Sequence, residues 1–153
     1  MLRRIVVGLA VGVLSATTVF AQAAAPAQPA APNPFIFPGD GGVILNFVKA
    51  DKTADFEMVM GKLKEALQKS AKPERKEQAK GWKVFRSPDP AGANVLYVFI
   101  IDPAVKGADY QVSNIITENF SGAEANEILK KYSEAYAQGM NIVNLGLIQD
   151  LGK

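Results

Sequence analysis

The sequence predicts one α+β domain in which two helices and a four-stranded antiparallel sheet share a single core. Three observations support this class. Residues from 43 onward follow the order strand, helix, strand, strand, helix, strand. The run 95–101 is wholly apolar or aromatic, as expected for an inner strand. Residues 35–153 are enough for one domain with a modest core.

The N-terminus has the layout of a secretory signal peptide, assigned to residues 1–23. Arg3 and Arg4 precede a nearly continuous apolar run, and Ala21-Gln-Ala23 offers small residues for cleavage. The apolar run is shorter than the ~20 residues that span a bilayer, so no stable membrane insertion is expected after cleavage. An Ala/Pro-rich stretch follows, which predicts a disordered tether over 24–40 and a folded domain over 41–153. We therefore expect a secreted or periplasmic protein.

The net charge and the absence of cysteine and histidine exclude several classes of function. The leader holds two of the 17 Lys and Arg residues and none of the 15 acidic ones, so the remaining chain is balanced in charge. No basic surface therefore argues for nucleic acid. The chain contains neither cysteine nor histidine. Disulfides, zinc sites with His or Cys ligands, haem held by a proximal histidine and Ser-His-Asp triads all lack essential parts, and no cofactor or metal is expected.

The first half of the domain is predicted as a strand followed by two helices. Val43–Val48 is a short β-type run, and 49–53 is a turn that leads into a helix ending near Ser70. Pro73 suits the first turn of a second, short helix, and Gly81 suits its end. The first helix carries an apolar stripe at helical spacing: Phe56, Val59, Met60, Leu63 and Leu67.

A hairpin is predicted next. Residues 82–87 alternate weakly and favour a strand, and the loop 87–93 contains two prolines and a glycine. The apolar strand spans 94–102, and Pro103 ends it because proline cannot continue an inner ladder.

The last part is predicted to contain helical turns, a longer helix and a final strand. The pattern over 112–120 suggests one or two helical turns, and Ser121-Gly-Ala-Glu124 matches a capping box. The helix behind it is expected to close at Gly139, and 141–148 is expected to form the last strand. Its apolar stripe comprises Ala125, Ile128, Leu129, Tyr132 and Tyr136.

This order is the split β-α-β, or ferredoxin-like, unit, for which the sheet order is 4-1-3-2 with all neighbours antiparallel. Two helices would cover one face of the sheet. The other face would remain apolar, whereas antiparallel sheets that face water usually alternate apolar and polar residues. A bare face of this kind marks an interface or a ligand site.

The same order, with an apolar second face, resembles the dimeric α/β-barrel superfamily. The most suggestive local piece is Phe47-Val-Lys-Ala-Asp-Lys-Thr-Ala-Asp-Phe-Glu57, which looks like the strand-turn-helix opening of antibiotic-biosynthesis-type monooxygenases and stress-responsive barrel proteins. The resemblance covers roughly 43–150 and rests on pattern and topology. It implies a homodimer whose two sheets pack face to face, with small apolar ligands held between sheet and helices or inside the barrel. Ordinary monomeric ferredoxin-like domains fit the pattern as well.

Five residues are candidates for a ligand site. Asn46 and Asn144 share a face parity on strands expected to be neighbours, so two amides would meet on an otherwise apolar surface. Trp82, Arg86 and Tyr97 have the residue types that cofactor-independent members of the superfamily place around a substrate. Each also has a plain structural explanation. The amides can satisfy each other, a water or a loop, the two aromatic rings can belong to the core, and an edge-strand arginine can face solvent.

These observations lead to one main functional hypothesis and two alternatives. The main one is an exported barrel domain of unassigned activity that dimerises and binds a small apolar ligand. The first alternative is a cofactor-independent oxygenase or isomerase for an aromatic or quinol-like compound, favoured if Asn46, Asn144 and Tyr97 converge on one cavity. The second is an envelope or partner-binding module with an apolar groove that survives dimerisation.

Overall fold

The computed structural model describes residues 32–152 of the chain. The predicted signal peptide over 1–23 and the first part of the predicted tether lie outside these residues. Within them, the elements along the chain are β1 (Gly41–Lys49), a 3-10 turn (Ala50–Lys52), α1 (Thr53–Lys69), α2 (Pro73–Gly81), β2 (Trp82–Arg86), β3 (Asn94–Ile101), α3 (Val112–Asn119), α4 (Gly122–Ala135) and β4 (Asn141–Leu145).

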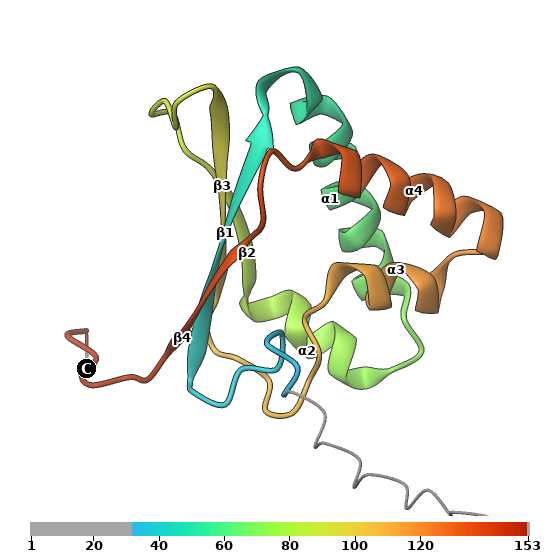
Figure 1. Ribbon diagram of the computed structural model, residues 1–153. Helices are drawn as coiled ribbons and strands as arrows, with labels where there is room; N and C mark the ends of the chain where they lie inside the picture. The colour runs from blue at the N-terminus through green and yellow to red at the C-terminus, as the bar shows by residue number, and fades with distance from the viewer. Residues whose placement is uncertain (1–31, 153) are drawn as a thin grey trace, which may run out of the picture. The chain divides into compact units, whose positions relative to one another are not determined.

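The four strands form one sheet in the order β2-β3-β1-β4, and every neighbouring pair is antiparallel. Read from the other edge, this order is 4-1-3-2. Figure 1 shows all four helices on the same side of the sheet. The α+β class and the four-stranded antiparallel sheet are confirmed, and the domain is compatible with a ferredoxin-like fold.

Alternation along the strands separates a buried face from an uncovered one. In β1, Ile44, Asn46 and Val48 are at most 1% exposed, while the residues between them are only half-buried. In β3, Tyr97, Phe99 and Ile101 are buried in the same way. These buried residues pack against the apolar stripes of the helices, so the core lies between the sheet and the helical layer.

Two element ends differ by three or more residues from the sequence-based expectation. α4 stops at Ala135 rather than Gly139, because Tyr136 is already extended and Ala137 N donates to Phe47 O at 2.9 Å. β4 stops at Leu145 rather than Ile148, because its partner strand begins at Gly41, opposite Leu145. The predicted capping box is also wrong in part, since the Ser121 side chain makes no cap hydrogen bond.

The segment assigned to the tether is part of the packed domain from Phe35 onward. Tyr110 N donates to Phe35 O at 3.0 Å, and the Phe37 side chain is fully buried against Tyr110, with ring centroids 5.4 Å apart. Gly42 is required beneath this ring, because a Cβ there would lie 2.1 Å from a ring carbon. The large apolar side chains at 35–37 therefore anchor the segment to the sheet.

A buried ion pair holds α2 against α3. Arg75 is only 2% exposed, and its Nε and Nη2 donate to the two carboxylate oxygens of Glu118 at 3.1 and 2.9 Å. Its Nη1 donates to Gln78 Oε1 and to the backbone oxygen of Asp109. Each of the three guanidinium nitrogens thus has a hydrogen-bond partner, which lowers the cost of burying the charge.

Replacing Glu118 with glutamine tests this contact. The buried Arg75 would lose its charged partner, so we expect the free energy of unfolding to fall by about 1–3 kcal/mol in urea denaturation. The Arg75 hydrogen bonds, with help from Lys72, hold the pKa of Glu118 below its ordinary value of 4.5. A lowered folded-state pKa stabilises the protein above the unfolded-state pKa, and this contribution is lost as pH falls through the folded-state value. The wild type should therefore lose stability on acidification more steeply than Glu118→Gln.

Glu77→Gln is the matched control. Glu77 pairs with Lys80 at 2.7 Å, but both side chains are more than half exposed, so its loss should change stability by less than about 0.5 kcal/mol. Equal stability of the two variants would show that the Arg75–Glu118 pair contributes nothing.

Candidate functional site

Two features of the domain could bind something: the uncovered side of the sheet and a pocket beside α4. We call the first the open face, defined by the apolar strand residues whose side chains point away from the helices. Strand register places nine such residues there: Val43, Leu45, Phe47, Phe85, Leu96, Val98, Ile100, Val143 and Leu145.

The open face is apolar on its two central strands and mixed apolar and polar on its two edge strands. Leu45 lies opposite Val98, and Phe47 lies opposite Leu96, so the two central strands present a continuous apolar surface. Phe85 on β2 is 49% exposed and Val143 on β4 is 45% exposed. Polar residues of this face, such as Lys83 and Asn141, sit on the edge strands β2 and β4. A contiguous apolar surface of this kind often marks an interface or a ligand site.

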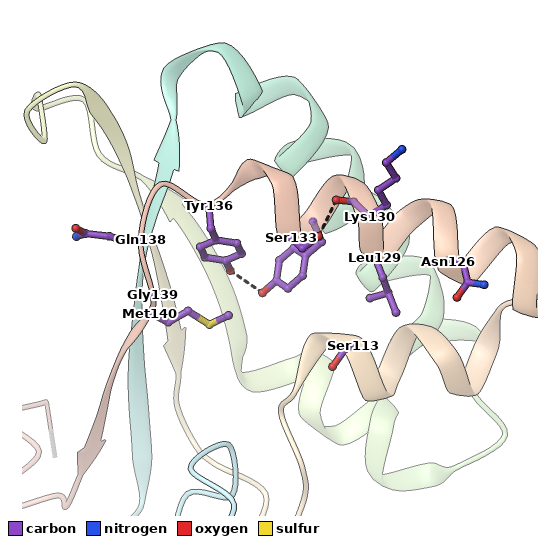
Figure 2. A pocket seen from close by; sticks show the side chains of 10 residues that line it. Ser113, Asn126, Leu129, Lys130, Ser133, Tyr136, Gln138, Gly139 and Met140 are labelled. Carbon is purple, nitrogen blue, oxygen red and sulfur yellow. Dashed lines mark hydrogen bonds between the residues drawn. The ribbon is translucent and has the colours of Figure 1, made fainter.

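The second feature, the α4 pocket, has a volume of about 860 Å³ and lies between α4, the start of α3 and the chain leading into β4. Figure 2 shows Leu129 from α4, Ser113 from α3 and Met140 from the segment before β4 around this space. Tyr132 and Tyr136 also line it, and their rings pack edge to face with centroids 5.0 Å apart. The accessible wall is therefore mainly apolar and aromatic. Its polar groups are hydroxyls and the side chains of Asn126, Lys130 and Gln138.

A hydrogen-bonded chain runs from the pocket into the sheet. The Asn46 side chain is fully buried, and its Nδ2 donates to the backbone oxygens of Ile44 and Tyr97 at 3.1 and 3.2 Å. Its Oδ1 accepts from the Tyr136 hydroxyl at 2.8 Å. The Tyr136 and Tyr132 hydroxyl oxygens lie 2.7 Å apart, as the dashed line in Figure 2 marks. One amide thus connects β1, β3 and α4.

Burial keeps both tyrosines of this chain neutral. It raises the pKa of Tyr132 well above its ordinary value of 10.0. Burial also raises the pKa of Tyr136, and the neighbouring Tyr132 raises it further. The pocket therefore presents neutral tyrosine hydroxyl groups at neutral pH.

The structure does not bring the two predicted asparagines together. Asn144 lies opposite Gly42, four residues along β1 from Asn46, which corresponds to about 13 Å. Both share the helix-side parity, as the sequence suggested, but Asn144 is exposed on the edge strand whereas Asn46 is fully buried. The alternation of side chains along the strands therefore predicts the correct face for both asparagines. The pairing register of β1 and β4 places them too far apart to contact each other.

Tyr97 and Arg86 belong to a different cluster, at the outer end of β3 and β2. The Tyr97 hydroxyl donates to Glu57 Oε1 at 2.5 Å, and Arg86 Nη1 donates to the same oxygen at 3.2 Å. Burial raises the pKa of Tyr97 to about 12, and the hydrogen bond to Glu57 adds to the effect. This group ties α1 to the sheet, and none of its three residues lines the α4 pocket.

Trp82 lies half-buried at the start of β2 and packs edge to face against Phe99 and Tyr110, at 5.7 and 5.2 Å between centroids. Its Nε1 is buried without a hydrogen-bond partner among residues 32–152. Trp82 also lines a smaller pocket of about 300 Å³ between α1, α2 and β2, away from the tyrosine pair. The five candidates therefore fall into separate places, and of these only Asn46 connects to the α4 pocket.

Sequence reasoning assigned Tyr132 and Tyr136 to the apolar stripe of the last helix and did not treat them as site residues. Their rings do pack in the core, where Phe56 lies 6.0 and 5.9 Å from the two centroids. The available signal was their spacing of four residues, because two hydroxyl groups on the buried side of one helix require partners.

Comparison of the chain with models of protein families, with curated proteins and with solved structures gives no match. Among residues 32–152, no group of three or more acidic side chains is arranged to hold a metal ion. Within the same residues, no helix combines the length and the apolar character needed to cross a bilayer.

Replacing Asn46 with aspartate tests the buried amide. A carboxylate at this position cannot make both donations to the Ile44 and Tyr97 backbone oxygens, and a buried unpaired charge is costly. We expect the free energy of unfolding to fall by at least about 3 kcal/mol, measured by urea denaturation followed by circular dichroism.

The matched control is Asn144→Asp, which makes the same chemical change on an exposed edge of the same sheet side. It should change stability by less than about 0.5 kcal/mol. Similar losses in both variants would contradict the assignment of Asn46 as the central polar contact.

Proposed function

We propose that this protein is an exported ferredoxin-like domain that pairs through its open face as a homodimeric α/β barrel and binds a small apolar ligand in the α4 pocket. The dimer part of the proposal is supported by the open face, where nine apolar strand residues lie on the side of the sheet that the helices do not cover. The export of the protein rests on the sequence of residues 1–23.

A second copy is the occupant that best suits the open face. The face is apolar across its two central strands, so a partner must offer an apolar surface of similar extent, and an identical sheet does so by symmetry. Pairing would bury Leu45, Phe47 and Val98. Burial of apolar surface stabilises a complex by about 25 cal/mol per Å². The polar residues at the edge strands would then form the rim of the interface.

The ligand part of the proposal is supported by the α4 pocket. Small-molecule sites are mostly apolar concavities with a few fixed polar groups, and the Tyr132–Tyr136–Asn46 chain supplies such groups beside Leu129 and Met140. The oxygenase or isomerase alternative required Asn46, Asn144 and Tyr97 to converge on one cavity. That convergence is not seen, and binding is therefore proposed in place of catalysis.

Replacing Val98 with aspartate tests the dimer. Val98 lies at the centre of the open face, so an unpaired carboxylate there should raise the dimer dissociation constant at least about 100-fold while leaving the subunit folded. Phe99→Asp places the same charge on the helix side, where Phe99 is fully buried, and should unfold the subunit. Sedimentation velocity and circular dichroism separate the two results.

Lys83→Asp is a control on the same face, because Lys83 lies on the edge strand β2 and is already charged. It should weaken the dimer little. A wild-type protein that is monomeric at micromolar concentration would refute the dimer and leave a ferredoxin-like monomer with a ligand pocket.

Cleavage of the leader is a separate prediction. The native protein purified from its source should lack residues 1–23, because the sequence has the layout that signal peptidase recognises. Intact-mass spectrometry checks this. A native protein that retains Met1 and the apolar run would contradict export by cleavage.

A further inference from the structure

The direction of each hydrogen bond in the Tyr132–Tyr136–Asn46 chain can be worked out from the partners of Asn46. An amide oxygen and nitrogen are hard to distinguish by shape, and their partners must decide. Here the group that contacts Ile44 O and Tyr97 O faces two acceptors, so it must be the nitrogen. The Asn46 oxygen therefore points toward Tyr136, where it accepts a hydrogen bond.

This fixes the hydrogen of Tyr136. A phenol carries one hydrogen, and the Asn46 oxygen has none to give, so the 2.8 Å contact requires Tyr136 to donate to Asn46. If Tyr136 instead gave its hydrogen to Tyr132, two oxygen lone pairs would face each other beside Asn46 in a buried place. Such an unsatisfied contact is costly, so the alternative order is excluded.

The hydrogen of Tyr132 follows in the same way. The Tyr136 oxygen has already used its hydrogen, so the 2.7 Å contact between the two hydroxyls requires Tyr132 to donate to Tyr136. The Tyr132 oxygen is then left with accepting capacity only. Among residues 32–152, Tyr136 is the hydrogen-bond partner that this hydroxyl has, and Tyr132 lines the α4 pocket although it is only 8% exposed.

A buried acceptor without a donor at the wall of an apolar pocket selects for a complementary group. We propose that the α4 pocket binds neutral molecules with an aromatic or similarly apolar body and one O–H or N–H donor, which bonds to the Tyr132 hydroxyl oxygen. The inference rests on the proposed ligand-binding function and specifies its ligand class. A molecule that offers only an acceptor would meet oxygen lone pairs at this point, while Leu129 and Met140 would contact its apolar part equally well.

The test compares two probes that differ only in the donor: 2-naphthol, which has an O–H group, and 2-methoxynaphthalene, in which a methyl group replaces that hydrogen. Isothermal titration calorimetry on the full mature protein gives both dissociation constants. We expect the wild type to bind 2-naphthol about tenfold more tightly, the difference that one net hydrogen bond supplies.

Two variants test the order of the hydrogens. Tyr132→Phe removes the acceptor, so the two probes should bind within about twofold of each other, with 2-methoxynaphthalene binding retained. Tyr136→Phe leaves the acceptor in place but frees the hydrogen of Tyr132, so the hydroxyl can donate to either probe and the tenfold preference should also fall toward unity. Ser133→Ala is the control. Ser133 also lines the pocket, but it is exposed, so water can reach its oxygen while its hydrogen bonds to Lys130 O, and the preference should persist. Circular dichroism confirms that each variant is folded.

The outcomes separate this inference from the function on which it rests. A tenfold preference in the wild type that is lost in Tyr132→Phe and kept in Ser133→Ala supports the ligand class. Equal binding of both probes by the wild type, or a preference that survives Tyr132→Phe, overturns the donor requirement and leaves ligand binding intact. Failure of both probes to bind the folded wild type at millimolar concentration overturns the pocket as an apolar ligand site, and the inference with it.

Discussion

The central strands β1 and β3 are apolar on both faces, yet the chain supplies helices for only one of them. This difference between the two faces determines which strand residues form the core and which stay partly exposed. On the helix side, alternating residues such as Ile44 and Phe99 are fully buried and form the core. On the other side, Leu45 and Val98 alternate with them in the same strands and stay half-exposed. Because a sheet residue cannot change face without shifting the whole strand register, the apolar side chains of the open face cannot be hidden within the subunit.

Asn46 is a fully buried polar residue on the helix side of the sheet, and its amide needs hydrogen-bond partners there. Its nitrogen is satisfied by backbone oxygens of β1 and β3, and its oxygen needs a donor from the helical layer. Tyr136 meets that need from the first residue beyond α4, where the chain is already turning toward the sheet. The same contact therefore joins the C-terminal end of α4 to the sheet beside the pocket.

Sequence patterns predicted the elements well because each depends on local spacing, as in the helix from Pro73 to Gly81. They predicted site residues less well because those depend on register and on distant packing. Parity placed Asn46 and Asn144 on one face, but β4 pairs with β1 so that Asn144 meets Gly42. The Ala/Pro-rich composition before Phe37 predicted a disordered segment, so the packing of Phe37 on Gly42 was not expected. The tyrosine pair was assigned correctly to the core, but its hydroxyl order depends on an amide 90 residues away from Tyr136.

The pKa values and hydrogen bonds of the pocket tyrosines also help to decide between ligand binding and acid-base catalysis as the role of the α4 pocket. A general acid or base works best when its pKa lies near the working pH, and burial moves both pocket tyrosines in the opposite direction, upward. The chain has no histidine that could take over proton transfer. The hydrogen of Tyr132 is committed to Tyr136, and that of Tyr136 to Asn46, so neither is free for transfer to a substrate. A fixed, neutral acceptor of this kind is well suited to recognising a neutral donor, which supports the proposal of selective binding over one of proton transfer.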